Sequence, residues 1–182
     1  KVAFLGKDIR GMRRHYAWLR KMLGRKKLLK KIKAIGQKEK RKVTNRLHEI
    51  SNTIILWAEK TKAIIVLGDL KGIRKSAKGR VMRRLLSAVP FYKLTHMLSY
   101  KAEQHGLQVF RIDESYTSKQ CHKCNCLGTR DKQASFSCAN CGMQYNADLN
   151  GARNILNRAR EQGILAGAMA HAQKIALTER LR

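Results

Sequence analysis

Acidic residues are scarce in this chain of 182 residues, which carries 12 Asp and Glu against 40 Lys and Arg. The formal net charge of +28 causes strong self-repulsion, so we expect a polyanionic partner, with nucleic acid first and a membrane surface as the alternative. The sequence has no apolar run near the roughly 18 residues that a membrane-spanning helix needs, and its N-terminus does not resemble a signal peptide. These absences favour a nucleic-acid-binding protein of the reducing cytoplasm.

Proline is limited to Pro90, which suits the first turn of a helix, and no internal repeat is visible. The longest apolar strings, such as residues 63–67, have only the length of a strand. The chain is long enough for one domain, or for one domain with a small insertion. Its first residue is Lys1 rather than Met, so we expect a fragment of a longer protein.

Four of the five cysteines form two Cys-x-x-Cys pairs, Cys121 with Cys124 and Cys138 with Cys141, separated by thirteen residues. Two tight turns of this kind can face each other and supply the four thiolates of a closed, structural zinc site. Zinc bound in this way lowers the formal net charge by two, to +26. Two disulfides, which suit small secreted domains, are the alternative. We expect Cys126 to be a loop thiol outside the zinc site.

A basic helical hairpin is expected over residues 8–60. Apolar residues recur at helical spacing behind Asp8, a candidate N-cap, and Gly24 ends this first run. A second apolar stripe predicts an amphipathic core helix, and its members are Val43, Leu47, Ile50, Ile54 and Trp57.

Between these two helical runs, residues 25–42 form a dense basic block in which Glu39 is the single acid. Such density predicts phosphate contact or a mobile basic loop, with a solvated helix face as the alternative. The candidate nucleic-acid-binding residues of the whole chain are Arg25, Lys26, Lys27, Lys30, Lys31, Lys71, Arg74, Lys75 and Arg153.

Strands and helices alternate in the second half of the chain. We expect a buried strand at 63–68, helices within 79–105 and a second strand at 107–113. This order, with its long crossover, favours parallel pairing in an α/β sheet. A zinc ribbon at 116–146 then interrupts the fold, and a last helix with a basic tail follows at 147–182.

The expected interior of this second half is small. The last helix is predicted to bury a stripe formed by Ala152, Ile155, Leu156 and Ala159. The aromatic residues Tyr116, Phe136 and Tyr145 are expected to pack the ribbon, with base stacking as the alternative for one of them.

The few acids stand at the ends of predicted elements. Asp69 follows the first strand, Asp113 and Glu114 end the second, and Asp148 opens the last helix. Carboxylates that converge in this way can hold Mg²⁺ for phosphodiester cleavage, which a basic metal-dependent nuclease requires. The alternative is that they are N-caps and surface acids.

Four stretches in this order resemble the C-terminal part of the TnpB/OrfB family of transposon-encoded proteins, which are related to compact type V CRISPR effectors and Fanzor proteins. These stretches cover residues 64–74, 113–124, 138–141 and 146–155. The resemblance implies a RuvC-like, RNase H-type fold with an inserted four-cysteine zinc ribbon. It also implies RNA-guided DNA cleavage, with DNA and guide RNA as partners and Mg²⁺ held by three acids.

The resemblance assigns the last catalytic Asp to Asp148, whereas the family's first catalytic Asp lies on a strand upstream of the helix that matches residues 8–23. Most of the family carries its catalytic Glu where this sequence has Gly68, and some branches resemble this chain in placing that Glu at Glu114. We therefore expect a partial RuvC-like fold without its first strands, in which Glu114 and Asp148 are the catalytic, Mg²⁺-binding residues. In the alternative, Gly68 marks an inactivated copy, a nucleic-acid-binding zinc-ribbon remnant of a transposon protein.

Overall fold

The computed structural model describes residues 2–69, 79, 90–130 and 134–164. The chain divides into two compact units, one formed by Lys1–Lys62 with Gly72–Gly106 and the other by Ala63–Lys71 with Leu107–Arg182. Within the described part of the chain, no helix combines the length and apolar character needed to cross a membrane.

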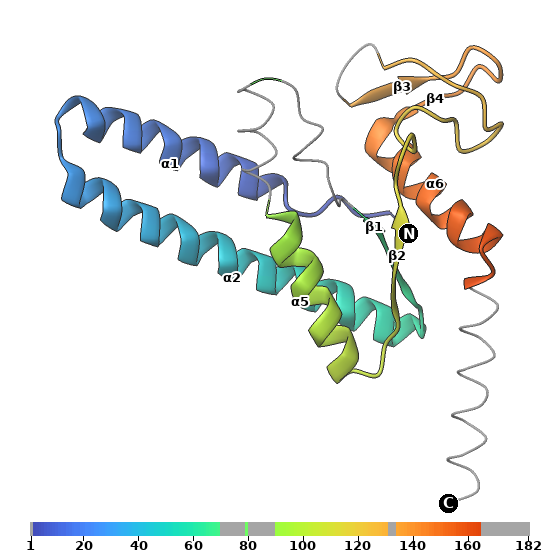
Figure 1. Cartoon of the computed structure of the whole chain (residues 1–182), viewed down its shortest axis with the longest axis horizontal. Helices are drawn as coiled ribbons and strands as arrows, with labels where there is room; N and C mark the ends of the chain where they lie inside the picture. Colours follow the sequence, from blue (N-terminus) through green and yellow to red (C-terminus); the bar gives the residue numbers. More distant parts are fainter. Residues whose placement is uncertain (1, 70–78, 80–89, 131–133, 165–182) are drawn as a thin grey trace, which may run out of the picture. The chain divides into compact units, whose positions relative to one another are not determined.

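The first unit consists of three helices, α1 (Lys7–Arg25), α2 (Leu29–Thr61) and α5 (Phe91–Gln104). Helices α1 and α2 form the expected hairpin, and α5 lies against α2 (Figure 1). Apolar side chains from all three helices build one core, and its buried members are Ile9, Val43, Leu47, Ile50 and Met97. The hairpin is therefore held by side-chain burial between its helices.

Helix α2 is continuous over 33 residues, so the interpretation of residues 25–42 as a mobile basic loop is wrong. Lys, Arg, Glu, Gln and Ala, which dominate the start of α2, are strong helix formers, and no proline interrupts them. Glu39 forms an ion pair with Arg20 of α1, which ties the basic half of α2 to its neighbour. The basic side chains are thus displayed on a rigid helix.

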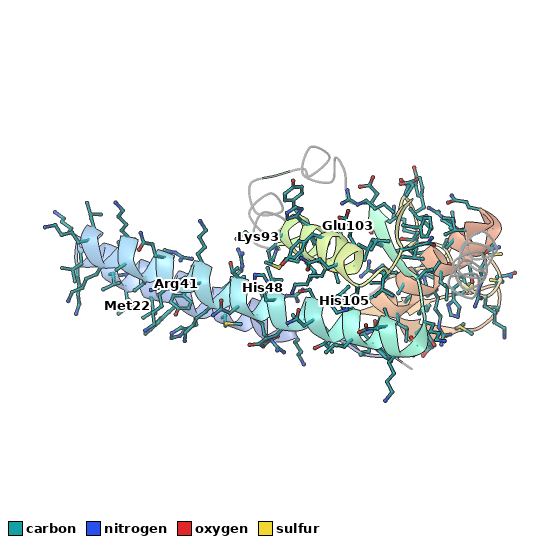
Figure 2. The ribbon with its side chains drawn as sticks, turned by 90° about the horizontal axis from the view of Figure 1, so that it is seen from below. Met22, Arg41, His48, Lys93, Glu103 and His105 are labelled. Atoms are coloured by element: carbon teal, nitrogen blue, oxygen red, sulfur yellow. The ribbon has the colours of Figure 1, made fainter. Side chains whose placement is uncertain are left out.

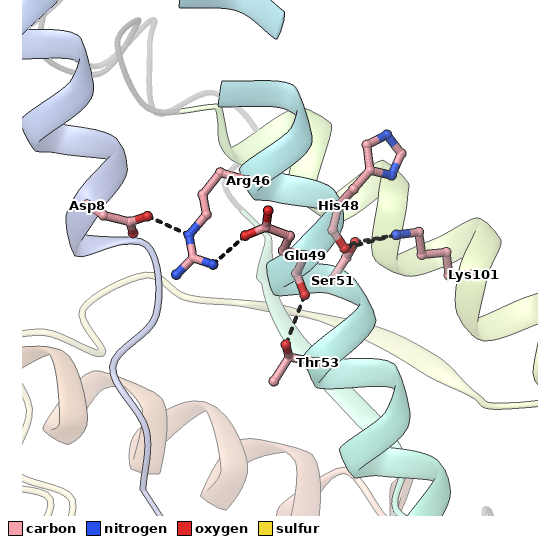
Figure 3. A network of polar contacts seen from close by, with 7 residues as sticks. All are labelled: Asp8, Arg46, His48, Glu49, Ser51, Thr53 and Lys101. Carbon is pink, nitrogen blue, oxygen red and sulfur yellow. Dashed lines mark hydrogen bonds and ion pairs between the residues drawn. The ribbon is translucent and has the colours of Figure 1, made fainter. Parts of the chain in front are cut away.

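The start of α1 also differs from the prediction. Its N-cap is Gly6, in the left-handed conformation at φ 82°, and Asp8 lies in the first turn. Glycine adopts this conformation without strain. The Asp8 carboxylate accepts a hydrogen bond from Nε of Arg46 at 2.5 Å, and Arg46 also contacts Glu49 at 2.6 Å (Figure 3). Asp8 therefore links the two helices instead of capping one.

The core face of α2 turns toward α5 near its end. Trp57, expected in the core, is 37% exposed, whereas Ile55 is only 2% exposed. Lys101 of α5 donates from Nζ to Oγ of Ser51 at 2.7 Å and to the carbonyl of His48 at 3.2 Å (Figure 3). Burial lowers the pKa of Lys101. The contact with α5 thus involves Ser51, and the buried side of α2 includes Ser51 and Ile55, neither of which belonged to the single stripe expected from the sequence.

Helix α5 begins after Pro90, which is its N-cap residue, and Gly106 at φ 64° follows its last turn. Leu98 and Ala102 of this helix are buried, whereas Phe91 at its start is 42% exposed. The other helical residues expected within 79–89 lie outside the described part except Gly79.

The second unit contains a parallel pair of strands, β1 (Ile65–Asp69) and β2 (Val109–Asp113), which confirms the predicted parallel pairing. Gly68 is paired with Ile112, and Asp69 with Asp113. Helix α6 (Ala147–Glu161) contacts both strands. The carboxyl ends of the two strands are therefore at one edge, where their acids follow.

The ribbon is built around the short antiparallel strands β3 (Ser135–Ser137) and β4 (Gln144–Asn146). Phe136 is fully buried, and Gly128 packs so closely that a Cβ there would lie 2.4 Å from Cζ of Phe136. Tyr145 is partly buried. Tyr116 is 72% exposed with φ 61°, so the prediction that it packs the ribbon is wrong.

Candidate functional site

The two Cys-x-x-Cys loops have the same backbone geometry. The amide of Cys121 donates to the carbonyl of Cys126, and that of Cys138 to the carbonyl of Met143, each at 2.9 Å. The residue after the second cysteine is left-handed in both loops, Asn125 at φ 59° and Gly142 at φ 67°. Asn and Gly are the residues that tolerate this conformation best. The repeat turns both pairs of thiols toward one point.

The four sulfur atoms lie within 4.8 Å of one another. Sγ of Cys121 is 3.6 Å from that of Cys141, and Sγ of Cys124 is 3.5 Å from that of Cys138. A tetrahedral zinc–thiolate site, with metal–sulfur bonds of about 2.3 Å, requires sulfur separations of about 3.8 Å. All five cysteines are free, so the disulfide alternative is not formed. These four cysteines can hold one metal ion.

Local hydrogen bonds make the four thiols unequal. The backbone amide of Cys126, followed by the side chain of Asn140, lowers the pKa of Cys124 to about 6. The backbone amide of Met143 acts in the same direction on Cys141, but burial and the neighbouring thiols outweigh it and raise that pKa to about 12. Cys126 is exposed and outside the four-sulfur cluster, as expected.

Helix α6 is attached to the ribbon by buried asparagines, which the apolar stripe did not predict. Asn150 is fully buried and Asn154 is 4% exposed, whereas Leu156 of the predicted stripe is 38% exposed. Nδ2 of Asn154 donates to the carbonyls of Thr117 and Gln120, each at 2.7 Å. Buried carbonyls need such partners. The available signal was the repeat of Asn at 146, 150 and 154, one helical turn apart.

Asn150 also fixes His122. Its side-chain carbonyl accepts from the amide of His122 at 3.0 Å and lies 2.9 Å from Nδ1 of the same residue. Because that oxygen can only accept, Nδ1 carries the proton and Nε2 accepts from Arg153 at 3.0 Å. Arg153 also lies 4.7 Å from the ring centre of Tyr145, a cation–π contact. Its predicted nucleic-acid contact stays a prediction.

Asp148 lies in the first turn of α6 and is exposed. The side chain of Asn146 caps this helix by accepting from the amides of Asp148 at 3.0 Å and Leu149 at 3.1 Å. A carboxylate near a helix N-terminus is favoured by the helix dipole. The cap thus fixes the backbone from which Asp148 extends.

Glu114, directly after β2, fills the space beside Gly68 of β1. A Cβ built on Gly68 would lie 2.2 Å from Oε2 of Glu114. Burial of the Glu114 side chain raises its pKa, and the charges of Asp113 and Asp69 raise it further. An ionised Glu114 is therefore costly without a nearby cation.

The backbone on both sides of Glu114 is held by Arg158 of α6. Its guanidinium donates to the carbonyls of Asp113 and Ser115, each at 2.7 Å. The Asp113 carboxylate accepts from the hydroxyl and the amide of Ser115, and these bonds lower the pKa of Asp113. Glu114 is thus presented from a braced turn.

The structure places the other predicted site residues as follows. Arg25, Lys26, Lys27, Lys30 and Lys31 are exposed at the turn between α1 and α2. Lys71, Arg74 and Lys75 lie outside the described residues. In the described ranges, Glu114 and Asp148 do not join a third acid in a cluster of the kind the cysteines form.

Comparisons with known proteins identify several similar proteins. The model of the family described as "Cas12f1-like, TNB domain" matches residues 91–155. The chain is 34% identical over 139 residues to TnpB-like protein MJ0751 of Methanocaldococcus jannaschii, covering 73% of this chain and 50% of that protein. It is 38% identical over 137 residues to the CRISPR-associated endodeoxyribonuclease Cas12f1 of Sulfoacidibacillus thermotolerans, covering 72% of this chain and 31% of that protein.

Among solved structures, the Cas12f1–sgRNA–target DNA complex matches with a TM-score of 0.59 at 24% identity, over 77% of this chain and 41% of that one. This likeness supports the fold. The chain spans about half the length of the TnpB-like relative and about a third of the Cas12f1 relative. Together with the family-model match, these similarities show that the chain belongs to the family of TnpB-like and Cas12f-like proteins.

Proposed function

We propose that this chain is the C-terminal part of an RNA-guided, Mg²⁺-dependent DNA endonuclease, with DNA and guide RNA as its partners. The observation that carries the proposal is the position of Glu114 in the space left open by Gly68. In the resembled family the catalytic glutamate stands either at the position of Gly68 or at that of Glu114. Because Glu114 lies in the space beside Gly68, both positions bring a carboxylate to the same region. The relatives named as an endodeoxyribonuclease and a TnpB-like protein support the reaction class.

The proposed fold is a partial RuvC-like core interrupted by the ribbon. Residues 1–115 form its first part, 116–146 the ribbon and 147–182 the last helix with a basic tail. The parallel pair β1–β2, with an aspartate as the last residue of each strand, supports this division. So does α6, which follows the ribbon and contacts both strands.

Two kinds of metal are assigned to the chain. Cys121, Cys124, Cys138 and Cys141 hold a structural zinc ion, since four thiolates leave no open coordination position. Glu114 and Asp148 bind Mg²⁺ together with an acid from outside this segment. Magnesium, when bound, activates water and stabilises the leaving oxygen of a phosphodiester. Arg158 keeps Glu114 oriented through the two carbonyls beside it.

The test uses the complete protein with its guide RNA, Mg²⁺ and a target plasmid. Glu114→Gln and Asp148→Asn are expected to abolish cleavage while guide RNA binding and zinc content stay unchanged. Glu161→Gln, at the exposed end of α6, is the matched control. Asp69→Asn is expected to retain cleavage. It therefore distinguishes the role of Asp69, at the end of β1, from that of Glu114, directly after β2. Cleavage by Glu114→Gln at the wild-type rate contradicts the assignment.

The second candidate is a nucleic-acid-binding remnant that does not cut. It is favoured by Gly68, which stands where most of the resembled family carries its catalytic glutamate. In this case the complete wild-type protein binds guide RNA and target DNA, and Mg²⁺ produces no cleavage.

A further inference from the structure

An open cavity of about 360 Å³, with both charged and apolar lining residues, lies within the first unit, between α1, α2 and the start of α5. Its volume is at the small end of the range of ligand sites, roughly 300–1,000 Å³. Its charged lining is Arg13 and Arg20 from α1, Glu39 and Lys40 from α2, and Lys93 from α5. Four cations therefore face one carboxylate, and that carboxylate is already paired with Arg20.

Arg13 is the residue that makes the cavity more than a basic surface. Its Nε is buried, and among the described residues it has no hydrogen-bond acceptor. A buried N–H of a guanidinium without an acceptor is costly, and the cost is removed when a negatively charged oxygen enters. The cavity beside it is large enough to admit such a group.

The backbone around the cavity favours the same kind of ligand. Gly36 lines it from the N-terminal part of α2, and apart from the nearby backbone of its own helix no heavy atom lies within 4 Å of the place where its Cβ would be. Glycine weakens a helix interior relative to alanine, but here it keeps the space open. Pro90 lines the other side, so α5 directs its N-terminal end, where helices favour anions, toward the cavity.

Lys93 has a fixed place at this site. Its Nζ donates to Oγ1 of Thr44 at 3.2 Å, which joins α5 to α2 at the cavity wall. Figure 2 shows Lys93 on the part of α5 that lies over α2. The ammonium retains further N–H donors for a ligand, since a lysine carries three.

We propose that this cavity binds a phosphate group through Arg13, Lys40 and Lys93. A nucleic-acid backbone is the favoured source. The exposed basic turn from Arg25 to Lys31 begins about five residues beyond Arg20 on the same helix, roughly 8 Å along its axis. One strand can therefore contact both places. The inference concerns binding only and does not rest on the proposed cleavage reaction.

Three variants of the chain test the proposal. Arg13→Gln removes the guanidinium whose Nε is buried, and Arg14→Gln removes the same charge from an exposed neighbour on the same helix. Gly36→Leu fills the cavity without changing charge, and it replaces glycine by a better helix former. Melting temperature is measured for each variant to confirm folding. Affinity for a short fluorescein-labelled DNA duplex is measured by anisotropy over a series of NaCl concentrations.

Arg13→Gln is expected to weaken duplex binding about tenfold and to reduce the salt slope by about one, as for a lost phosphate contact. Gly36→Leu should weaken binding without lowering the melting temperature, and Arg14→Gln should change affinity less than about twofold. The proposal is overturned by the following combination of results. Arg13→Gln and Arg14→Gln weaken duplex binding equally, and Gly36→Leu changes neither duplex affinity nor the effect of free phosphate on melting temperature.

Free phosphate is distinguished from the nucleic-acid backbone by a second assay. Sodium phosphate is compared with sodium chloride at equal ionic strength for its effect on melting temperature. Free phosphate is the ligand of this cavity if phosphate raises the melting temperature, if Arg13→Gln and Gly36→Leu both remove that increase, and if Gly36→Leu leaves duplex affinity unchanged.

Discussion

Glu114 and Gly68 share one space at the ends of the two parallel strands. The carboxylate of Glu114 stands where a side chain on residue 68 would begin, since a Cβ there would lie 2.2 Å from Oε2 of Glu114 and 3.1 Å from Cδ1 of Ile155. A side chain at position 68 and the observed position of Glu114 are therefore mutually exclusive. The glycine is what permits the glutamate to lie there.

Adding a single methyl group at position 68 should disturb this relationship. Gly68→Ala is expected to displace the Glu114 carboxylate and to lower DNA cleavage by the complete protein about 100-fold, since small misplacements of reacting groups are costly. Gly151→Ala is the matched control, because the nearest atom to its added Cβ is 3.9 Å away. The double variant Gly68→Glu with Glu114→Gly should recover part of the activity. Full activity of Gly68→Ala contradicts the shared-space interpretation.

The raised pKa of Glu114 gives the fold a pH dependence. Because burial, Asp113 and Asp69 raise it in the folded state, protonated Glu114 contributes stability that is fully present below the ordinary value of 4.5. That contribution is lost as pH rises through the raised pKa. Without added divalent cations, Glu114→Gln should therefore exceed wild type in melting temperature near neutral pH, and the difference should vanish below about pH 4.5. A difference that grows toward acid pH contradicts the sign.

Metal removal should affect the ribbon and the helices of the first unit differently. Cys124→Ser is expected to lose the bound zinc and to unfold the ribbon, because site formation and folding of such small modules are coupled. Cys126→Ser is the matched control and should retain the metal, since Cys126 lies outside the cluster. Zinc content is measured by atomic absorption, and helix content by far-ultraviolet circular dichroism. Native zinc content in Cys124→Ser contradicts the four-cysteine assignment.

The buried asparagines of α6 should matter more than its partly exposed leucine. Asn154→Ala removes the donor to two carbonyls and should cost about 1–3 kcal/mol of stability in the second unit. Leu156→Ala should cost less than about 1 kcal/mol, since its side chain remains partly in solvent. Urea titration followed by metal release to a chromogenic chelator measures both. The opposite ranking supports the apolar stripe expected from the sequence.

Local patterns were sufficient for much of this fold. Cys-x-x-Cys spacing predicted the cluster of four sulfurs, because the thiols of each pair lie on one turn. The short β-branched run after Lys62, followed at a distance by a second strand, predicted the parallel pair β1–β2. The apolar period of α2 predicted its contact with α1, through Val43, Leu47 and Ile50. Each motif, strand or helix behind these predictions is recognised from residues close together in the chain.

Tertiary packing decided what those patterns left open. In the folded chain α2 buries Ile55 and leaves Trp57 partly exposed, against the single stripe expected from the sequence. The carbonyls of Gln120 and Thr117, which accept hydrogen bonds from these side chains, explain why α6 buries Asn150 and Asn154 in place of a continuous apolar stripe. The apolar periodicity of α6 does not reveal this hydrogen-bonding demand from a distant loop, which only the spacing of the asparagines indicates.

The candidate site shows the same division. The sequence by itself determined that a glutamate follows one strand, that a glycine lies near the end of the other and that a scarcity of acids leaves a strongly basic chain. Only the tertiary structure decided that Glu114 lies in the space of Gly68, and that Arg13 has a buried Nε beside a cavity. The reason is physical: periodicity and spacing specify which face a side chain occupies, whereas shared volume and unmet hydrogen bonds exist only after distant segments pack together.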